Sequence, residues 1–333
     1  MKTCTQCILP ETFPGIKFDD KGVCNHCLSF KGLTILEEQK KEYEEKFLAL
    51  IKQRRNHGSY DCLMAYSGGK DSTYTLQVLK QRYGLRVLAL TLDNSFVSDS
   101  AFRNMRNVTD NLGIDHIIFK PRFDLMKQIF RRASEEDIYS KKTLERASTI
   151  CTSCIGIVKF VTLKTALEKG IMLIGYGWSP GQAPIQSSIM KTNPALIKAT
   201  QAAIQNPLSK LVGEDVNSYF LNEEHFAMAD KFPYNIHPLA FLDYNEDKIV
   251  EEIKQLGWQM PDDTDSNSTN CLLNAFANDV HIKKFKFHPY VWEIANMVRA
   301  GAMGREEGYK KIYGEQPAGL LNEAKKRLGW TTS

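Results

Sequence analysis

YSGGKDS, residues 66–72, is the stretch that decides the fold of this chain. A short apolar run (61–65) precedes it and a helical pattern (72–82) follows it, so the stretch is a glycine turn between a strand and a helix. Gly68 and Gly69 leave room for a phosphate, and the first N–H groups of the following helix have no partner within it. Such donors bind anions, helped by the positive end of the helix dipole. The stretch therefore predicts a phosphate-binding loop.

The side chains of this loop suit a triphosphate that carries a metal ion. Lys70 can add positive charge, and the hydroxyls of Ser67 and Ser72 can bond to phosphate oxygens. Asp71 is placed to help hold a magnesium ion. The predicted nucleotide-binding residues here are Ala65, Tyr66, Ser67, Gly68, Gly69, Lys70, Asp71 and Ser72, with Lys70 and Asp71 as catalytic residues.

The loop does not have the G-x4-G-K-[ST] spacing of a Walker A loop. It resembles SGG-x-DS, the signature of the PP-loop ATP pyrophosphatases, and it matches at every fixed position of residues 67–72. The resemblance implies ATP and Mg²⁺ as cofactors and an adenine nucleotide alpha hydrolase-like fold. It also implies that AMP is moved onto a carbonyl or carboxyl oxygen and is then displaced by a nitrogen or sulfur nucleophile.

Bulk properties narrow the class of protein. The 333 residues, 43% hydrophobic and 25% charged, suit one large or two ordinary globular domains. A net charge of +4 neither requires nor excludes a nucleic-acid partner. The N-terminus has no apolar signal core and no apolar run is long enough to span a bilayer, so we expect a cytoplasmic protein with no membrane partner. Eight cysteines in a reducing compartment then favour metal or sulfur chemistry over disulfides.

Strands and helices alternate after the loop, with strands expected at 85–92, 115–119 and 171–174 and a helix at 99–111. The alternation predicts an α/β fold, a doubly wound parallel sheet with its ligand at the carboxyl ends of the strands. Two groups of residues lie at such ends. The resemblance implies that the first binds adenine and ribose and that the second closes over the phosphates, although the second lacks the family's usual G-H-x-x-D-D form. The groups are Thr91, Asp93 and Asn94, and Gly175, Gly177, Ser179 and Gln182.

The N-terminus carries two cysteine pairs, Cys4-x2-Cys7 and Cys24-x2-Cys27, with sixteen residues between them. Two such knuckles can close a tetrahedral site of four thiolates, which is a zinc-ribbon pattern. Four thiolates leave no open coordination position, so the predicted role of the zinc is structural. His26 lies inside the second knuckle, but the cysteines have the better spacing.

The remaining chain is expected to be mostly helical. We expect a helix over 184–212, an extended loop over 232–241, a polar surface or cleft segment over 261–271, and helices over 272–330 that Gly301, Gly304 and Gly308 interrupt. The predicted domains are a zinc ribbon (1–32), a linking helix (33–58), a PP-loop ATP-binding domain (59–230) and a helical C-terminal region that completes the active site (231–333).

Three cysteines remain once the ribbon has taken four and Cys62 is assigned to the core strand. Cys151 and Cys154 begin a helix whose dipole, together with Lys159, is expected to favour thiolates. With Cys271 they form a set of three thiols, which can hold a 4Fe-4S cluster and leave one iron open. The set resembles that of the iron-sulfur tRNA 2-thiolation enzymes, which implies catalytic roles for all three cysteines.

A second resemblance covers other parts of the chain. Residues 4–27, CTQCILPETFPGIKFDDKGVCNHC, resemble the opening of the N-acetyl sugar amidotransferases of lipopolysaccharide synthesis, and MGREEGYKKI (303–312) resembles their closing helix. This resemblance implies ammonia from a partner glutaminase and no cluster. A third class, a non-catalytic zinc-ribbon adaptor, is disfavoured by the intact SGGKDS.

The sequence thus predicts an ATP-dependent sulfurtransferase that adenylates a carbonyl oxygen and replaces it with sulfur. The alternative is the amidotransferase. The expected partners are a sulfur donor or carrier, or the glutaminase in the alternative. The acceptor is a small molecule, a nucleotide or a tRNA, and related enzymes are often homodimers.

Overall fold

The computed structural model describes residues 1–265, 267–314 and 318–330, and a six-stranded sheet forms its centre. The strand order is β3-β2-β1-β4-β6-β5, and all neighbours are parallel except β5 and β6. The strands are β1 (Cys62–Ala65), β2 (Val87–Leu92), β3 (Asp115–Phe119), β4 (Leu173–Tyr176), β5 (Ile189–Lys191) and β6 (Tyr234–Ile236). The predicted α/β class with a mainly parallel sheet is confirmed.

The strand order reverses between β1 and β4. The chain moves outward from β1 through β2 to β3, then returns to place β4 on the other side of β1. Ligands of open α/β sheets bind in the crevice at such a reversal, outside the carboxyl ends of the strands. The two loops that leave β1 and β4 are the phosphate loop and the segment that begins at Gly177. The topology therefore brings together two of the predicted site segments.

Helices cover both faces of the sheet because both faces carry apolar side chains, as β1 illustrates. Its side chains alternate, so that Cys62 and Met64 enter one hydrophobic core while Leu63 enters the other. Cys62 is fully buried, as predicted. The first core is shared with α2 (Leu33–Arg54), α3 (Lys70–Gln77), α4 (Asp99–Leu112) and α9 (Glu246–Lys254). The second is shared with α5 (Phe123–Glu135), α6 (Thr149–Lys169) and α7 (Pro194–Val212).

Within the described residues, α6 is the one helix long and apolar enough to cross a membrane. More than half of it, 56%, is buried inside the protein. Its apolar composition is explained by its place in the second core, where α5, α7 and the sheet surround it.

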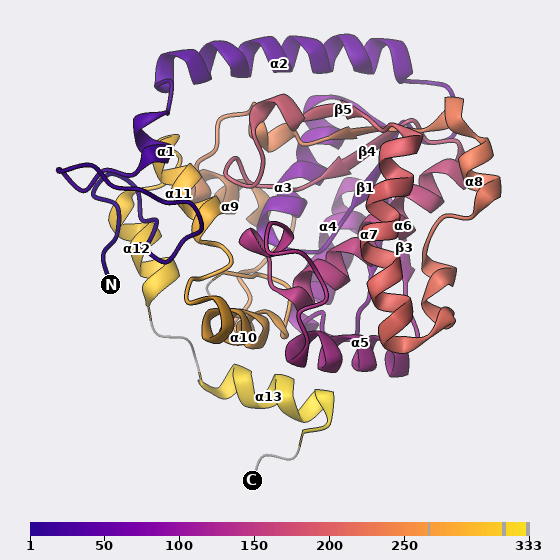
Figure 1. The fold of residues 1–333 in the computed structure, drawn as a ribbon. Helices are drawn as coiled ribbons and strands as arrows, with labels where there is room; N and C mark the ends of the chain where they lie inside the picture. Colours follow the sequence, from indigo (N-terminus) through magenta and orange to yellow (C-terminus); the bar gives the residue numbers. More distant parts are fainter. Residues whose placement is uncertain (266, 315–317, 331–333) are drawn as a thin grey trace.

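The N-terminal segment packs on the C-terminal helices, although the two are far apart in the chain (Figure 1). The four N-terminal cysteines, of which Cys27 lies in the short helix α1 (Asn25–Leu28), share a third core with α11 (Val291–Arg299) and α12 (Arg305–Tyr313). The guanidinium of Arg305 donates to the carbonyl oxygens of Cys4 and Cys7, at 3.0 and 2.9 Å. These contacts fix the ribbon against the rest of the molecule.

The remaining elements are short turns and helices that close the layers. The helices are α8 (Glu223–Ala227), α10 (Asn274–Phe285) and α13 (Ala318–Leu328). The 3-10 turns lie at 143–145, 185–187, 214–219, 229–231 and 238–240, and a π-helical turn at 78–82 continues α3.

Two expectations about local structure are wrong. The segments 184–212 and 232–241 contain β5 and β6, each of three residues, where only a helix and a loop were expected. Strands this short show no alternation in the sequence, and they exist because β6 pairs with β4 and β5 pairs with β6. Gly308 does not interrupt a helix but lies inside α12, where a Cβ would come within 2.9 Å of Ile294 Cγ2.

The domain division proposed from the sequence remains a proposal. Its boundary at residue 230 falls between β5 and β6, which are hydrogen-bonded neighbours in the same sheet.

Candidate active site

The phosphate loop is held in a conformation that requires glycine. Gly68 has φ +74°, and a Cβ there would lie 2.9 Å from the carbonyl oxygen of Ala101. The indole Nε1 of Trp258 donates to the carbonyl oxygen of Gly68 at 3.0 Å. Gly69 is extended and caps α3, which begins at Lys70. The strand, turn and helix are therefore arranged as the sequence predicts.

The polar groups of the loop bond to one another in this structure. The hydroxyls of Ser67 and Ser72 lie 3.0 Å apart, and that of Ser72 also donates to the carbonyl oxygen of Gly69 at 3.0 Å. The backbone N–H of Lys70 donates to Thr269 Oγ1 at 2.9 Å. Thr269 belongs to the polar segment expected over 261–271, and this bond places its part of the segment against the loop.

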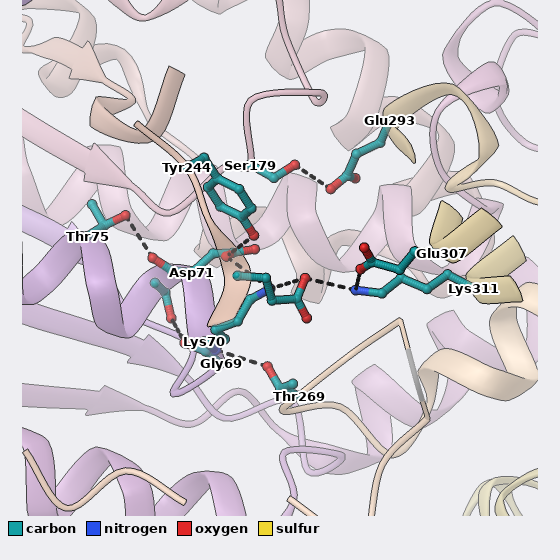
Figure 2. Close-up of polar contacts among 12 residues, drawn as sticks. Gly69, Lys70, Asp71, Thr75, Ser179, Tyr244, Thr269, Glu293, Glu307 and Lys311 are labelled. Atoms are coloured by element: carbon teal, nitrogen blue, oxygen red, sulfur yellow. Dashed lines mark hydrogen bonds and ion pairs between the residues drawn. The ribbon is translucent and has the colours of Figure 1, made fainter. Parts of the chain in front are cut away.

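The Lys70 ammonium is bound to carboxylates (Figure 2). Its Nζ lies 2.8 Å from Glu246 Oε2 and 3.6 Å from Asp71 Oδ1. Burial favours the neutral amine, but the charges of the two carboxylates outweigh it and raise the pKa of Lys70. Lys311 also binds Glu246 Oε2, at 2.8 Å, and the Tyr244 hydroxyl donates to Asp71 Oδ1 at 2.8 Å.

Tyr244, Glu246 and Lys311 were not among the predicted site residues. Asn245 caps α9, so the sequence indicates only an ordinary helix start at Glu246. Lys311 belongs to a run rich in charged residues (305–311), which is typical of a solvent-exposed helix. No local pattern shows that these side chains meet the phosphate loop.

The loop after β4 covers the start of α3. At Gly177 a Cβ would lie 2.4 Å from Ser72 Cα, so the two backbones approach as closely as glycine allows. Ser179 Oγ donates to Glu293 Oε1 at 2.5 Å. At Gly181 a Cβ would lie 2.1 Å from the carbonyl oxygen of Glu293, so this loop is packed directly on α11.

Glu293 was also missed. Burial raises its pKa to about 7, against a smaller opposing effect of the bond from Ser179. The available signal was a single acid within the otherwise apolar start of α11, Val-Trp-Glu-Ile-Ala. An acid in such a run is either paired or functional, because an isolated charge there is costly.

Residues at the end of β2 have partners within the protein. Thr91 Oγ1 donates to the carbonyl oxygen of Tyr66 at 2.5 Å, and Asp93 accepts from the N–H of Ser95 and pairs with Lys120 at 3.1 Å. The amide Nδ2 of Asn94 donates to Cys154 Sγ at 3.2 Å. Their assignment to adenine and ribose remains a prediction.

Cys151, Cys154 and Cys271 are brought together, and all three are half-buried. All three pack against the same hydrophobic core, and a negative charge on Cys151 or Cys154 would raise the pKa of Cys271, so the thiols lie close enough to interact electrostatically. The expectation that the helix start and Lys159 favour thiolates is wrong. Burial raises the pKa of each thiol, to about 12 for Cys151. Lys159 instead lies over the Trp178 ring at 5.0 Å, and burial lowers its pKa.

A buried polar network adjoins these thiols. Tyr290 donates its hydroxyl to Asn274 Oδ1 at 2.9 Å, and Asn274 Nδ2 donates to both carboxylate oxygens of Asp265. Asp265 is 3% exposed and burial raises its pKa. The network links α10 and α11 to the segment that carries Thr269 and Cys271.

The four N-terminal cysteines fit one metal ion. Their sulfur atoms all lie within 4.8 Å of one another and all four residues are buried. Cys4 Sγ and Cys27 Sγ are 3.8 Å apart, as are Cys7 Sγ and Cys24 Sγ. Four Zn–S bonds of about 2.3 Å in a tetrahedron require sulfur atoms about 3.8 Å apart. The described residues contain no other group of cysteine, histidine or acidic ligands close enough for a single ion.

Comparisons with known proteins give distant likenesses. No protein-family model matches the chain. The uncharacterized protein MJ1599 of Methanocaldococcus jannaschii is 24% identical over 312 residues, which cover 93% of this chain and 92% of that protein. The U34-tRNA thiolase NcsA from Methanococcus maripaludis, solved with its 4Fe-4S cluster, has a TM-score of 0.38 and 14% identity, covering 100% of this chain and 90% of that one. The NMN synthetase from Francisella tularensis has a TM-score of 0.37 and 11% identity, covering 88% of this chain and 98% of that one. At these scores, the interpretation of the site rests on the loop, the sheet order and the cysteines.

Proposed function

We propose that the protein is an ATP-dependent sulfurtransferase, which adenylates a carbonyl oxygen of its acceptor and replaces that oxygen with sulfur. One observation carries the proposal: a single segment touches both the phosphate loop and the three thiols. Thr269 Oγ1 accepts from the N–H of Lys70 at 2.9 Å, and Cys271, two residues later, neighbours Cys151 and Cys154. A nucleotide site and a sulfur site would thus share one cleft.

In the first step the loop binds ATP with Mg²⁺. The N–H groups at the start of α3 and the Lys70 ammonium would bind phosphate oxygens, and Asp71 would help hold the magnesium ion. Lys70 must leave Glu246 for this, and Lys311 remains to neutralise that carboxylate. The acceptor oxygen attacks the α-phosphorus, the bond to the bridging oxygen breaks, and pyrophosphate leaves with the stabilisation that Lys70 provides.

In the second step a sulfur nucleophile attacks the adenylated carbon, the bond from that carbon to the AMP oxygen breaks, and AMP leaves. Cys151, Cys154 and Cys271 would hold the sulfur source beside the loop. Three thiolates suit a 4Fe-4S cluster, which when bound leaves one iron open for sulfide. Metal binding would also remove the thiol protons that burial retains.

The four-thiol site would hold zinc in a structural role, because all its positions are filled by the protein. The partner implied is a sulfur donor or carrier, with a homodimer as the proposed assembly.

A second candidate is amide transfer with ammonia as nucleophile. It is favoured by the packing of the two segments on which that resemblance rests, since Arg305 donates to the carbonyl oxygens of Cys7 and Cys4 at 2.9 and 3.0 Å. The adenylation step would be the same, and the three thiols would have no role.

The test is anaerobic purification followed by an absorption spectrum and iron, sulfide and zinc analysis. The sulfurtransferase should contain about four irons and one zinc per chain. Cys271→Ser should lose the iron and keep the zinc. Ser268→Ala is the matched control, because it removes a neighbouring hydroxyl, which accepts from the N–H of Cys271 and donates to Asn270 Oδ1, but no thiol, and it should keep both metals.

Lys70→Ala should keep both metals and lose ATP-dependent pyrophosphate release by about a hundredfold or more. Zinc without iron after anaerobic reconstitution of the wild-type protein would contradict sulfur transfer and favour amide transfer.

A further inference from the structure

A cavity of about 1030 Å³ lies between the ribbon and the main body of the protein. The end of the ribbon, the start of α2, the loop after β4, the segment 240–244 and α11 form its walls. Its volume is at the upper end of the range for small-molecule sites. None of the residues assigned above to ATP or to the thiols lines it.

The cavity adjoins the phosphate loop through three shared elements. Tyr244 lines it, and the hydroxyl of the same tyrosine donates to Asp71. Pro180 lines it next to Ser179, and Trp292 lines it next to Glu293. The cavity therefore adjoins the loop across Tyr244, and Figure 2 shows the hydroxyl of Tyr244 directed toward Asp71.

The walls of the cavity are positively charged. Five cationic side chains line it against two acids, Glu37 and Asp243. Lys40 pairs with both acids, at 2.7 and 3.7 Å. The other four have no ion-pair partner in the described part of the chain, and they are Lys31, Arg146, Lys248 and Arg299.

Two of these cations lie over one aromatic ring. The guanidinium carbons of Arg146 and Arg299 are 5.9 and 5.4 Å from the centre of the Trp292 ring. Arg299 also donates to Asn296 Oδ1 and lies 3.9 Å from Cys27 Sγ, so its position is fixed from two sides. Guanidinium groups bind phosphate through paired N–H bonds, and such a fixed geometry reduces the entropy lost on binding.

Apolar side chains also line the cavity. Phe30, Leu33 and Ile35 line it and are 37%, 52% and 40% exposed. A ligand with a charged end and an uncharged remainder would match this mixed lining.

We propose that this cavity binds the acceptor and that the acceptor is a small molecule carrying a phosphate group. The statement that the ligand is the acceptor rests on the proposed function. Arg146 and Arg299 would bind the phosphate beside Trp292, and the group to be adenylated would be directed past Tyr244 toward the loop. The ribbon would then complete the acceptor site, since Phe30 and the contact of Cys27 with Arg299 belong to it.

The experiment measures binding and needs no turnover. The holoprotein is saturated with a non-hydrolysable ATP analogue, so that the phosphate loop is filled, and UMP is titrated while tryptophan fluorescence is followed. Uridine is the uncharged comparison, and Trp292→Phe identifies the reporting ring. We expect UMP to change the fluorescence and to bind at least tenfold more tightly than uridine.

Arg146→Gln and Arg299→Gln should each weaken UMP binding about tenfold or more, because each removes charge-assisted bonds to phosphate. Arg146 is exposed, so its variant remains informative if Arg299→Gln disturbs the ribbon. Lys210→Gln, an exposed charge change on α7 outside the cavity, should bind UMP as the wild type does.

The proposal is overturned if UMP does not bind at millimolar concentration, if uridine binds equally well, or if both arginine variants bind as the wild type does. Displacement of UMP by micromolar tRNA would overturn the small-molecule class in favour of a nucleic acid. Failure of this proposal can be told apart from failure of the sulfurtransferase proposal. The latter is tested by metal content and pyrophosphate release, which the binding measurement does not use.

Discussion

The four thiols of the ribbon and the three thiols beside the phosphate loop differ in how the chain brings them together. The ribbon cysteines lie within residues 4–27, are buried, and have sulfur atoms 3.8 Å apart in pairs. The other three come from α6 and from a loop more than a hundred residues later, and they are half-buried. Turns within one short segment can form the first group, whereas the second group exists only in the folded protein.

The two groups of thiols also differ in whether a metal site that they form keeps an open coordination position. Four thiolates fill a tetrahedral metal site, and a closed site stabilises the fold around it. Three thiolates leave a position for another ligand, and here one of the three residues, Cys271, lies two residues from Thr269, which contacts the loop at residues 66–72. We therefore expect the ribbon to have a structural role and the three other thiols to have a role in the reaction.

The largest effect is expected for Cys24→Ser in the ribbon. The variant loses one of four metal ligands, and we expect loss of zinc and destabilisation by several kcal/mol, because metal binding supplies the folding energy of so small a module. The loss should extend to α11 and α12, which share its core. Zinc analysis and thermal unfolding measure it, with the exposed Ser29→Ala as control. Unchanged zinc content and melting temperature would show that the ribbon is not a metal site.

The next prediction concerns Glu293 on α11. This helix packs on the ribbon, and Glu293 binds Ser179 in the loop after β4. Its pKa of about 7 lies above its ordinary 4.5, so the folded protein holds this proton more tightly than the unfolded chain does. Stability should therefore fall as pH rises between about 4.5 and 7, by at most about 3 kcal/mol, and then level off.

Urea unfolding at about pH 5 and about pH 8 measures this effect, and Glu293→Gln is the control because it keeps the shape and removes the titration. The wild type should lose more stability than the variant between these pH values. An equal loss in the two proteins would mean that Glu293 titrates normally.

The smallest effect is expected for Thr269→Val, which tests the contact between the phosphate loop and the segment of Cys271. The variant removes the acceptor of the Lys70 N–H and should lower the free energy of unfolding by about 1 kcal/mol. Thr264→Val, in the same polar segment, is the matched control, because its hydroxyl makes no hydrogen bond to the residues described. If the three-thiol group depends on this contact, iron retention should fall in Thr269→Val while zinc is unchanged. Equal behaviour of the two variants would show that the contact is incidental.

The regions of the molecule differ in how far the sequence predicted them. The loop at residues 66–72, the ribbon spacing and the alternation through residue 119 each depend on neighbours in the chain, and each was placed correctly. The strands β5 and β6 were missed, because a strand of three residues is too short to show an alternating pattern of apolar and polar residues. The predicted pKa direction of Cys151 and Cys154 was wrong, because burial in the folded protein raises the pKa of both thiols.

The sequence by itself determined the phosphate loop, the four-cysteine site and the α/β class, because these depend on residue spacing and on hydrogen bonds within short segments. The tertiary structure alone decided that Lys70 meets Glu246, that Glu293 meets Ser179, and that Cys271 stands beside Cys151. It also decided that a cationic cavity adjoins the loop. Contacts of this kind depend on how separate layers pack, and such packing leaves no periodic or local signal in the chain.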